Sequence, residues 1–467
     1  MSSTDNATRL AELKASMDSG NPARARLTAL FDPDSFVELD AFLQAEEGEA
    51  GVVAGYGLIE GGVAYAWSQD VTVSKGAVSA AHAGKIGKIY ELAAKTGCPV
   101  VCVYDSHGAK LDEGGAMLAA YSKMLQSANS LSGVVPQISV VLGPCAGVSA
   151  MLAAGSDFVI MEKEAELFLT APFIAKANGD SCEGAGSAAN AAKAGVADMV
   201  CEGQEACLEA ARKLLTMLPQ NNLAAAPLFD YTDPAGGFDP AGCPKLIVKG
   251  IADADSVLEL APEFGKGVYT FLGTMAGAAV GFLATSRENP LDGDACEKAA
   301  RFVKLCDAYS IPLVTLLGSK GFVLNSDVSV VRAAARMASA YAEATTAKVS
   351  VVTGTAFGPA YVAMGSKNGN ADVTLAWPQA QISALAPETA VEFLWTERFK
   401  GTENAEATRK ALVEEYIATE ASPIEAAKQG YIEAVITPEE TRKSVINMLD
   451  MLAGKRESKL PKKHATI

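Results

Sequence analysis

Apolar residues follow two patterns along the chain. Short apolar runs rich in β-branched residues and bounded by Gly, Pro or Asp are typical of buried strands, whereas apolar residues three or four positions apart are typical of helices. The first half therefore predicts helices at 7–31, 78–95 and 114–130, a Gly-containing turn into a helix over 143–154, and strands at 52–59, 63–69, 99–104 and 137–142. Strands separated by helices of this length favour a parallel arrangement built from strand–helix–strand units.

The second half of the chain repeats this order. Its strand-like runs and its helical stretch lie, in order, at 267–272, 279–285, 294–309 and 312–317. After the last of these, residues 318–321 fall on 105–108, and residues 351–354 fall on 140–143 with the glycine at the turn preserved. Two halves with one order of elements predict an internal duplication.

The length of 467 residues fits two domains of about 200 residues each. We expect an N-terminal domain at 1–230 and a C-terminal domain at 231–467. The stretch from 221 to 244 is rich in Pro, Gly and Asp, which is typical of an exposed linker between separately packed units.

Composition and charge narrow the classes of function. The formal charge of −16 disfavours general binding to nucleic acid or to an anionic membrane, although a local basic pocket or a helix N-terminus can still hold a phosphorylated ligand. Scattered cysteines without a CxxC pair and only three histidines provide no clustered metal ligands. The polar N-terminus and the absence of a long apolar run lead us to expect a cytoplasmic protein with reduced thiols.

Glycine-containing turns are the most promising places for chemistry. Each half has two places at which a strand runs into such a turn and then a helix: 105–109, 143–147, 318–321 and 354–360. Backbone N–H groups at such turns can stabilise a developing oxyanion with help from the helix dipole. The alternative interpretation is that these glycines only permit tight turns.

Side chains for acid–base catalysis are scarce. His464 lies in the tail and His82 lies within a predicted helix, so that His107, in a Gly-containing loop, is the one histidine in a functional position. The sequence contains no GxSxG, HExxH or Walker motif. Backbone donor pockets without an obvious acid or base suit enolate chemistry on thioesters.

Several motifs carry a resemblance to a known family. They are Asp34-Ser35-Phe36-Val37-Glu38-Leu39, Val135-Pro136-Gln137-Ile138-Ser139, Gly143-Pro144-Cys145-Ala146-Gly147, Glu297-Lys298-Ala299-Ala300-Arg301-Phe302, Ala376-Trp377-Pro378 and Leu460-Pro461-Lys462-Lys463-His464. The chain resembles, from about residue 20 to residue 464, the carboxyltransferase subunits of biotin-dependent acyl-CoA carboxylases and decarboxylases. That family includes the β subunit of propionyl-CoA carboxylase and the α subunit of methylmalonyl-CoA decarboxylase.

The resemblance implies two tandem crotonase-like domains in the α/β class, with the acyl-CoA bound mainly by the first and biotin mainly by the second. It implies a homo-oligomer, a dimer or a trimer of dimers, in which the active site lies between the N-terminal half of one subunit and the C-terminal half of its neighbour. The chain has no Met-Lys-Met biotinylation motif and no ATP-binding carboxylase region. It should therefore need a biotin carboxyl carrier protein, together with a biotin carboxylase or with membrane decarboxylase subunits.

The resemblance also implies site residues. Its first oxyanion loop corresponds to Ser106-His107-Gly108-Ala109, whose amides would stabilise the thioester enolate, and its second to Gly358-Pro359-Ala360-Tyr361, which would stabilise the biotin ureido oxygen. The expected catalytic residues are His107, Gly108, Ala109, Gly358 and Ala360. Those expected to shape the pocket or contact biotin or the acyl group are Gly143, Cys145, Ala146, Gly147, Pro359, Tyr361 and Val362.

This sequence departs from the family pattern at four places. His107 adds an imidazole, Pro359 deletes an N–H, Lys110 replaces an arginine, and residues 318–321 replace a Pro-Gly-Phe segment. Val362 stands where propionyl-type enzymes often carry a polar residue.

Three functions stay open at this stage. The first is carboxyl transfer, in either direction, on propionyl/methylmalonyl-CoA or acetyl/malonyl-CoA. The second is a biotin-independent hydratase or isomerase that uses Asp112 or Glu113. The third is a subunit that docks a biotin carrier but has lost transfer, which the Pro359 substitution suggests. A decarboxylase pump would place the protein at the periphery of the membrane.

Overall fold

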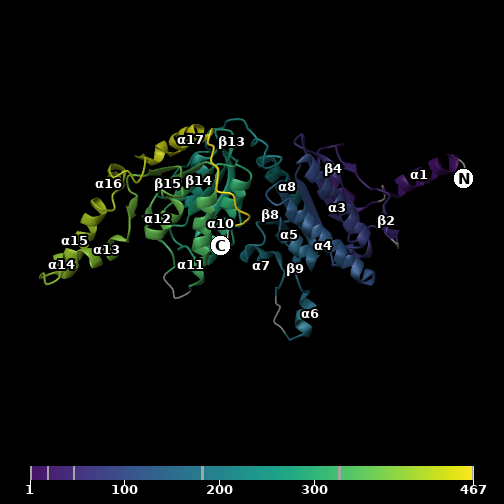
Figure 1. The fold of residues 1–467 in the computed structure, drawn as a ribbon, viewed down its shortest axis with the longest axis horizontal. Coiled ribbons are helices and arrows are strands. Elements are labelled where there is room, and N and C mark those ends of the chain that lie inside the picture. Colours follow the sequence, from purple (N-terminus) through teal and green to yellow (C-terminus); the bar gives the residue numbers. More distant parts are fainter. Residues whose placement is uncertain are drawn as a thin grey trace. The chain divides into compact units, whose positions relative to one another are not determined.

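The computed structural model describes residues 3–17, 20–45, 48–179, 184–323, 328–464 and 466. Its chain divides into two compact units, Met1–Ala225 and Ala226–Ile467, each with its own large sheet (Figure 1). The assignment of domains to 1–230 and 231–467 stays a prediction, because a compact unit need not be an independently folding domain.

The sheet of the N-terminal unit is mixed. In spatial order its strands are β1 (Val37–Glu38), β4 (Val52–Ile59), β5 (Gly62–Gln69), β6 (Val100–Ser106), β7 (Gln137–Ala146), β8 (Phe158–Glu162) and β10 (Met199–Cys201). The strands from β5 to β10 are parallel, as expected, but β1, β4 and β5 pair antiparallel. The parallel expectation applied to strands separated by helices, whereas the two-residue turn between β4 and β5 is too short for a crossover and joins them as an antiparallel pair.

Eight α-helices are described in this unit: α1 (Ser3–Met17), α2 (Pro22–Leu30), α3 (Ala80–Thr96), α4 (Gly115–Ser130), α5 (Val148–Ala154), α6 (Pro172–Ala177), α7 (Ala188–Lys193) and α8 (Gln204–Met217). The smaller elements are β2 (Gln44–Ala45), β3 (Gly48–Glu49), β9 (Glu166–Phe168), η1 (Ser74–Gly76) and η2 (Leu111–Glu113). The strand predicted to end at 142 continues to Ala146, because β7 pairs there with β9, and α5 begins at Val148, directly after the predicted turn at 143–147.

The C-terminal unit repeats this plan. Its sheet order is β11 (Leu258–Leu260), β12 (Val268–Met275), β13 (Ala278–Thr285), β14 (Leu313–Leu317), β15 (Lys348–Val352), β17 (Val373–Ala376) and β19 (Ala434–Val435), while β16 (Thr355–Phe357) pairs separately with β18 (Gln381–Ser383). Its helices are α9 (Pro244–Ile251), α10 (Gly293–Ala308), α11 (Ser329–Glu343), α12 (Gly358–Met364), α13 (Pro387–Leu394), α14 (Thr396–Phe399), α15 (Ala405–Ala418), α16 (Pro423–Lys428), η3 (Pro438–Glu440) and α17 (Thr441–Leu452).

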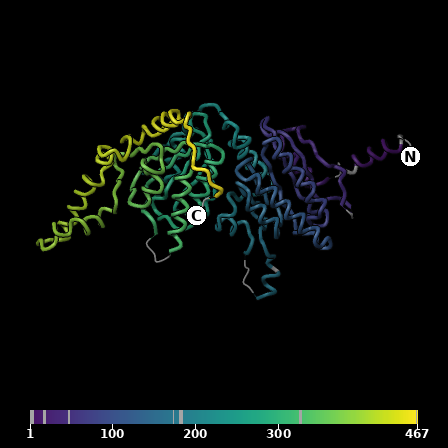
Figure 2. Tube along the Cα trace, viewed as in Figure 1, coloured from purple at the N-terminus to yellow at the C-terminus, as the bar shows by residue number. Residues whose placement is uncertain are grey.

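Within the C-terminal unit, α13, α14 and α15 form a helical arm that extends from the sheet (Figure 2). The arm has a small apolar core of its own, which includes Val391, Leu412 and Tyr416. Among the helices of the described residues, none is both long enough and apolar enough to cross a bilayer.

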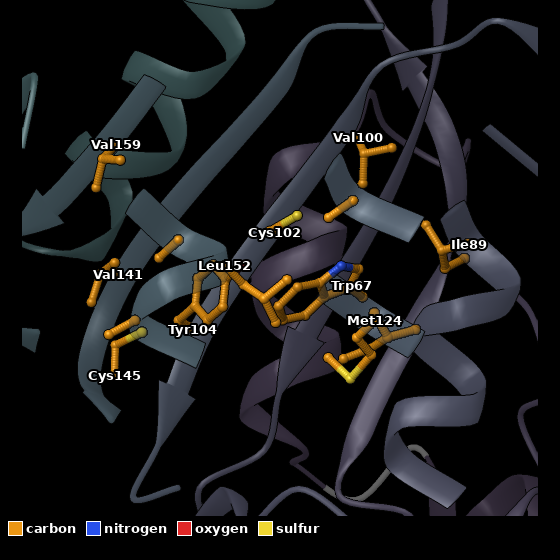
Figure 3. Close-up of a cluster of buried hydrophobic side chains, with 14 of the residues drawn as sticks. Trp67, Ile89, Val100, Cys102, Tyr104, Met124, Val141, Cys145, Leu152 and Val159 are labelled. Carbon is orange, nitrogen blue, oxygen red and sulfur yellow. The ribbon is translucent and has the colours of Figure 1, made fainter. Parts of the chain in front are cut away.

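The core of the N-terminal unit lies between the sheet and the helices α3, α4 and α5. Trp67 meets Tyr104 edge to face at 4.8 Å between ring centroids, and both side chains are fully buried beside Cys102 (Figure 3). Burial of one large apolar side chain contributes roughly 1.5–3 kcal/mol, so this packing fixes the strands whose ends carry the turns described next.

The duplication is confirmed down to single hydrogen bonds. Ser79 caps α3 by accepting from the His82 N–H, and Asp292 caps α10 by accepting from the Ala295 N–H. Just before each cap, Val78 N–H donates to Gly108 O at 2.9 Å, and Leu291 N–H donates to Gly321 O at the same distance.

Candidate functional site

The two Gly-containing turns of the N-terminal unit lie side by side. The register of β6 and β7 shifts between Tyr104 and Ser106, after which Ser106 pairs with Cys145. A Cβ on Gly108 would lie 3.7 Å from the Ala146 Cβ. The parallel strands thus bring the loop at 105–109 and the turn at 143–147 together at their carboxyl ends, as the sequence predicts.

The amides predicted to bind the enolate are already hydrogen-bonded. His107 N–H donates to Lys75 O at 3.1 Å, and Gly108 N–H donates to Ser106 Oγ at 3.1 Å. The loop continues into a bridge between Ala109 and Val78. The His107 side chain itself is exposed. An oxyanion could use the two amides only at the expense of these bonds.

The Gly108 bond and the bridge recur in the other unit, where Gly321 N–H donates to Ser319 Oγ at 3.0 Å and Leu291 bridges Phe322. The repetition indicates that this hydrogen-bonded loop is a structural feature of the fold that the two units share.

The second turn has unoccupied donor positions. Gly147 has φ +64° and ψ −127°, a conformation that favours glycine, and its N–H donates to Phe168 O at 2.9 Å. Val148 and Ser149 then begin α5, and the first N–H groups of a helix have no acceptor within it. Ala150 N–H already returns to Gly147 O at 3.1 Å. The amides of Val148, which is partly exposed, and of Ser149, which is buried, are therefore the donors at this end of the sheet that have no acceptor within the helix.

The C-terminal unit builds the same turn from β16 and α12. Ala356 pairs with Ile382 as Cys145 pairs with Leu167, so that Gly358 occupies the place of Gly147. Gly358 also has positive φ (+46°), and a Cβ there would approach Ala384 O to 2.8 Å. The next two residues after the glycine are Pro359 and Ala360, in place of Val148 and Ser149.

Pro359 has no N–H, so the C-terminal turn offers one donor fewer than its counterpart. Residues 147–149 of the first half are thus equivalent to Gly358–Ala360. The sequence interpretation named Gly147 but missed Val148 and Ser149. Extending the match of 140–143 to 351–354 by a few residues would have found them.

The remaining predicted residues lie in different surroundings. Cys145 is fully buried in the core near Val141 (Figure 3), where burial raises the pKa of its thiol, so its side chain does not face the turn. Tyr361 donates its hydroxyl to Tyr431 O at 2.9 Å, and burial raises its pKa to about 12. Pro359 and Val362 are exposed beside the buried Ala360. The turn is therefore accessible from solvent.

Gly143 is held by close packing. A Cβ on Gly143 would lie 2.2 Å from Asp105 Oδ1, so only glycine fits this position.

The side chains that a hydratase would need are occupied. Glu113 Oε2 accepts the N–H of Ala80 at 2.6 Å and so closes the start of α3. Asp112 is exposed, with Oδ2 at 3.9 Å from Lys110 Nζ. His82 is completely buried, and burial lowers its pKa to about 3. The described geometry favours a site made of backbone donors.

Comparisons with known proteins identify the family to which the chain belongs. The model of the family described as "Carboxyl transferase domain" matches residues 19–467. The chain is 36% identical to methylmalonyl-CoA decarboxylase subunit alpha of Propionigenium modestum, across 95% of this chain and 92% of that protein. It is also 36% identical to the propionyl-CoA carboxylase beta chain of Saccharopolyspora erythraea, across 95% and 90% of the two chains.

Among solved structures, transcarboxylase 12S with methylmalonyl-coenzyme A and methylmalonic acid bound superposes with a TM-score of 0.93 at 32% identity, over 100% of this chain and 98% of that one. These matches span both units and confirm the crotonase-like, two-domain fold. The chain therefore belongs to the carboxyl transferase family, as a carboxyltransferase of the biotin-dependent acyl-CoA carboxylases and decarboxylases.

Proposed function

We propose that this chain transfers a carboxyl group between carrier-bound biotin and a short-chain acyl-CoA of the methylmalonyl/propionyl class. Relatives named for these two substrates support the class, as does the bound ligand of the matching transcarboxylase. The single observation that carries the proposal is the duplicated strand–turn–helix, which supplies one backbone donor site in each unit.

In the N-terminal unit, the amides of Val148 and Ser149 would stabilise the enolate that forms when the malonyl C–C bond breaks. Gly147 directs the chain into α5 so that these amides follow the turn. One such donor typically lowers the barrier by about 2.7–4 kcal/mol. This assignment replaces the amides of His107 and Gly108, which are already bonded to Lys75 O and Ser106 Oγ.

In the C-terminal unit, Gly358, Ala360 and Tyr361 would form the biotin side of the site, with Pro359 and Val362 at its rim. Biotin, when bound, accepts or gives the carboxyl group on its ureido nitrogen and develops negative charge on its ureido oxygen. The accessible turn fits this group, because the Ala360 amide follows Pro359 at the start of α12.

The assembly follows from the division of ligands. If each site forms between the N-terminal unit of one copy and the C-terminal unit of another, as the family resemblance implies, residues 105–147 of one copy face 318–365 of another. The matching transcarboxylase 12S assembles as a hexamer, which supports an association of this kind. We expect a symmetric homo-oligomer that works with a separate biotin carrier. A strictly monomeric species that transfers carboxyl groups would contradict this arrangement.

The test uses the purified full chain with methylmalonyl-CoA and either free biotin or a biotinylated carrier domain. We expect propionyl-CoA and carboxylated biotin in equal amounts, with none formed when biotin is omitted. Formation of propionyl-CoA without biotin would overturn the proposal.

The alternative of a docking subunit without transfer rests on Pro359, which removes a donor from the biotin side. It predicts binding of the biotinylated carrier, measured by calorimetry, with no product in the assay above. The transfer proposal predicts both binding and product.

A further inference from the structure

Each unit contains a largely buried Arg–Asp ion pair at the turn of one hairpin, β4–β5 in the N-terminal unit and β12–β13 in the C-terminal unit. In the N-terminal unit, Arg212 and Asp32 lie 2.8 Å apart, and Asp32 accepts the amides at the β4–β5 turn. In the C-terminal unit, Arg442 and Asp253 lie 2.7 Å apart, and Asp253 accepts the amides at the β12–β13 turn. A pair repeated at the same place in both units serves the fold they share.

A third pair, Arg26–Asp105, has no such counterpart among the described residues of the C-terminal unit. Arg26 NH2 lies 2.7 Å from Asp105 Oδ2, and the two side chains are 10% and 7% exposed. Arg26 comes from α2 and also donates to Gln69 O at 3.4 Å. At the position of Asp105 the C-terminal unit has Gly318.

The rest of the strand end is the same in the two units. Asp105 N–H donates to the Gln69 side chain at 3.1 Å, and Gly318 N–H donates to the Thr285 side chain at 2.7 Å. The fold therefore forms this strand end with or without a carboxylate.

The Asp105 carboxylate lies at the point where β6 and β7 change register. Its Oδ1 packs on Gly143, where a Cβ would be only 2.2 Å away. In the C-terminal unit the two backbones meet directly, since a Cβ on Gly354 would lie 3.2 Å from the Gly318 Cα. The carboxylate thus separates strand ends that are in direct contact in the other unit, a few residues before Gly147.

We propose that Arg26 and Asp105 are positioning residues that hold the turn at 143–149 in the geometry that aims its amides at the acyl thioester. Buried ion pairs add little net stability, because desolvation offsets their attraction. The Arg26 cation also balances the Asp105 carboxylate, which would otherwise oppose the negative charge that develops nearby. The inference rests on the proposed function only in naming the thioester as the ligand.

The test compares Asp105→Asn with the matched control Asp253→Asn. Both substitutions are nearly isosteric and leave an arginine without its carboxylate, but only the first lies beside Gly143. We expect Asp105→Asn to lower kcat by roughly 10–100-fold, since small displacements of reacting groups have effects of this size, with the KM for biotin unchanged. Asp253→Asn should lower the melting temperature and keep kcat within about twofold.

Amide hydrogen exchange gives a readout that does not depend on activity. We expect faster exchange across 143–149 in Asp105→Asn and no change there in Asp253→Asn. Unchanged exchange in this segment, or equal kcat for the two variants, would overturn the inference, whereas an inactive wild type with the expected exchange pattern would contradict only the proposed function.

Discussion

The N-terminal and C-terminal units build the same turn from strand to helix but equip it differently. Both place a glycine with positive φ before the helix, Gly147 in one and Gly358 in the other. The next position is Val148, which retains an N–H, or Pro359, which has none. In the proposed function, a turn that both units keep serves a need common to both ligands, the stabilisation of an anion. The residues that differ indicate how each ligand is bound.

The largest effect is expected when the N-terminal turn loses the same N–H that the C-terminal turn lacks at Pro359. Val148→Pro should lower kcat by about 10²–10³-fold, because it deletes one N–H of the enolate site. Proline is tolerated at the first position of a helix, so the fold should persist. Steady-state assay and circular dichroism would check both points. Val148→Ala, which keeps the amide, should stay near wild type; equal losses in the two variants would exclude the amide as a donor.

Acid stability should also distinguish the units, because His82 is buried in α3 whereas Ala295 takes its place in α10. The folded pKa of His82 is about 3, below the ordinary value of about 6.5. The unfolded chain therefore binds the extra proton, and the unfolding free energy falls as pH drops from 6.5 towards 3, by up to about 1.4 kcal/mol per pH unit.

Urea titrations at several pH values would measure this slope, read by Trp67 fluorescence after Trp377→Phe and Trp395→Phe. In that background, the unfolding free energy of the N-terminal unit should depend less steeply on pH in the His82→Gln variant than in its parent. A slope unchanged by His82→Gln would contradict the prediction.

Val362, which is 62% exposed at the rim of the C-terminal turn, tests whether the biotin side of one copy also contacts the acyl group held by another copy in the proposed oligomer. Val362→Asp should lower kcat/KM for longer acyl chains more than for short ones, by roughly 10-fold or more, because a carboxylate would replace an apolar contact. Competition between acetyl-CoA, propionyl-CoA and butyryl-CoA would measure the ratio, with Val362→Ala as the control. Equal loss across chain lengths would mean that Val362 does not contact the acyl group.

Restoring the missing donor should have a small effect. We expect Pro359→Gly to leave kcat with free biotin unchanged and to cost about 0.4–1 kcal/mol of stability, because glycine is more flexible in the unfolded chain. A folded variant with higher kcat and unchanged acyl-CoA affinity would show that the wild type is limited by the absent N–H.

The smallest effect is expected at His107, whose side chain is exposed and whose amide is bonded to Lys75 O. His107→Gly should retain most activity across the pH range. A fall in kcat of roughly 10²–10⁴-fold, with one titration lost from the pH profile, would instead identify the imidazole as an acid or base.

Much of the fold was predictable from local pattern. Apolar periodicity indicated the buried strands β6, β7 and β14 and the helices α3, α4 and α10, and the matched glycines at 143 and 354 supported the duplication. The end of β7 was misplaced, because its extension to Ala146 depends on pairing with β9, about twenty residues later. A strand that continues through a Gly-Pro pair is set by its partner, which local propensity does not describe.

The sequence by itself determined the family and the two-fold repeat, since both are written in residue types and their spacing, and it led us to propose a site made of backbone donors. Only the tertiary structure decided which donors are available. The His107 N–H already donates to Lys75 O, which lies beside it in space. The negative charge of Asp105 is balanced by the Arg26 cation, which reaches it from α2. Every residue except proline has an amide, so residue types cannot tell a free amide from an occupied one. That distinction depends on which distant segment packs against it.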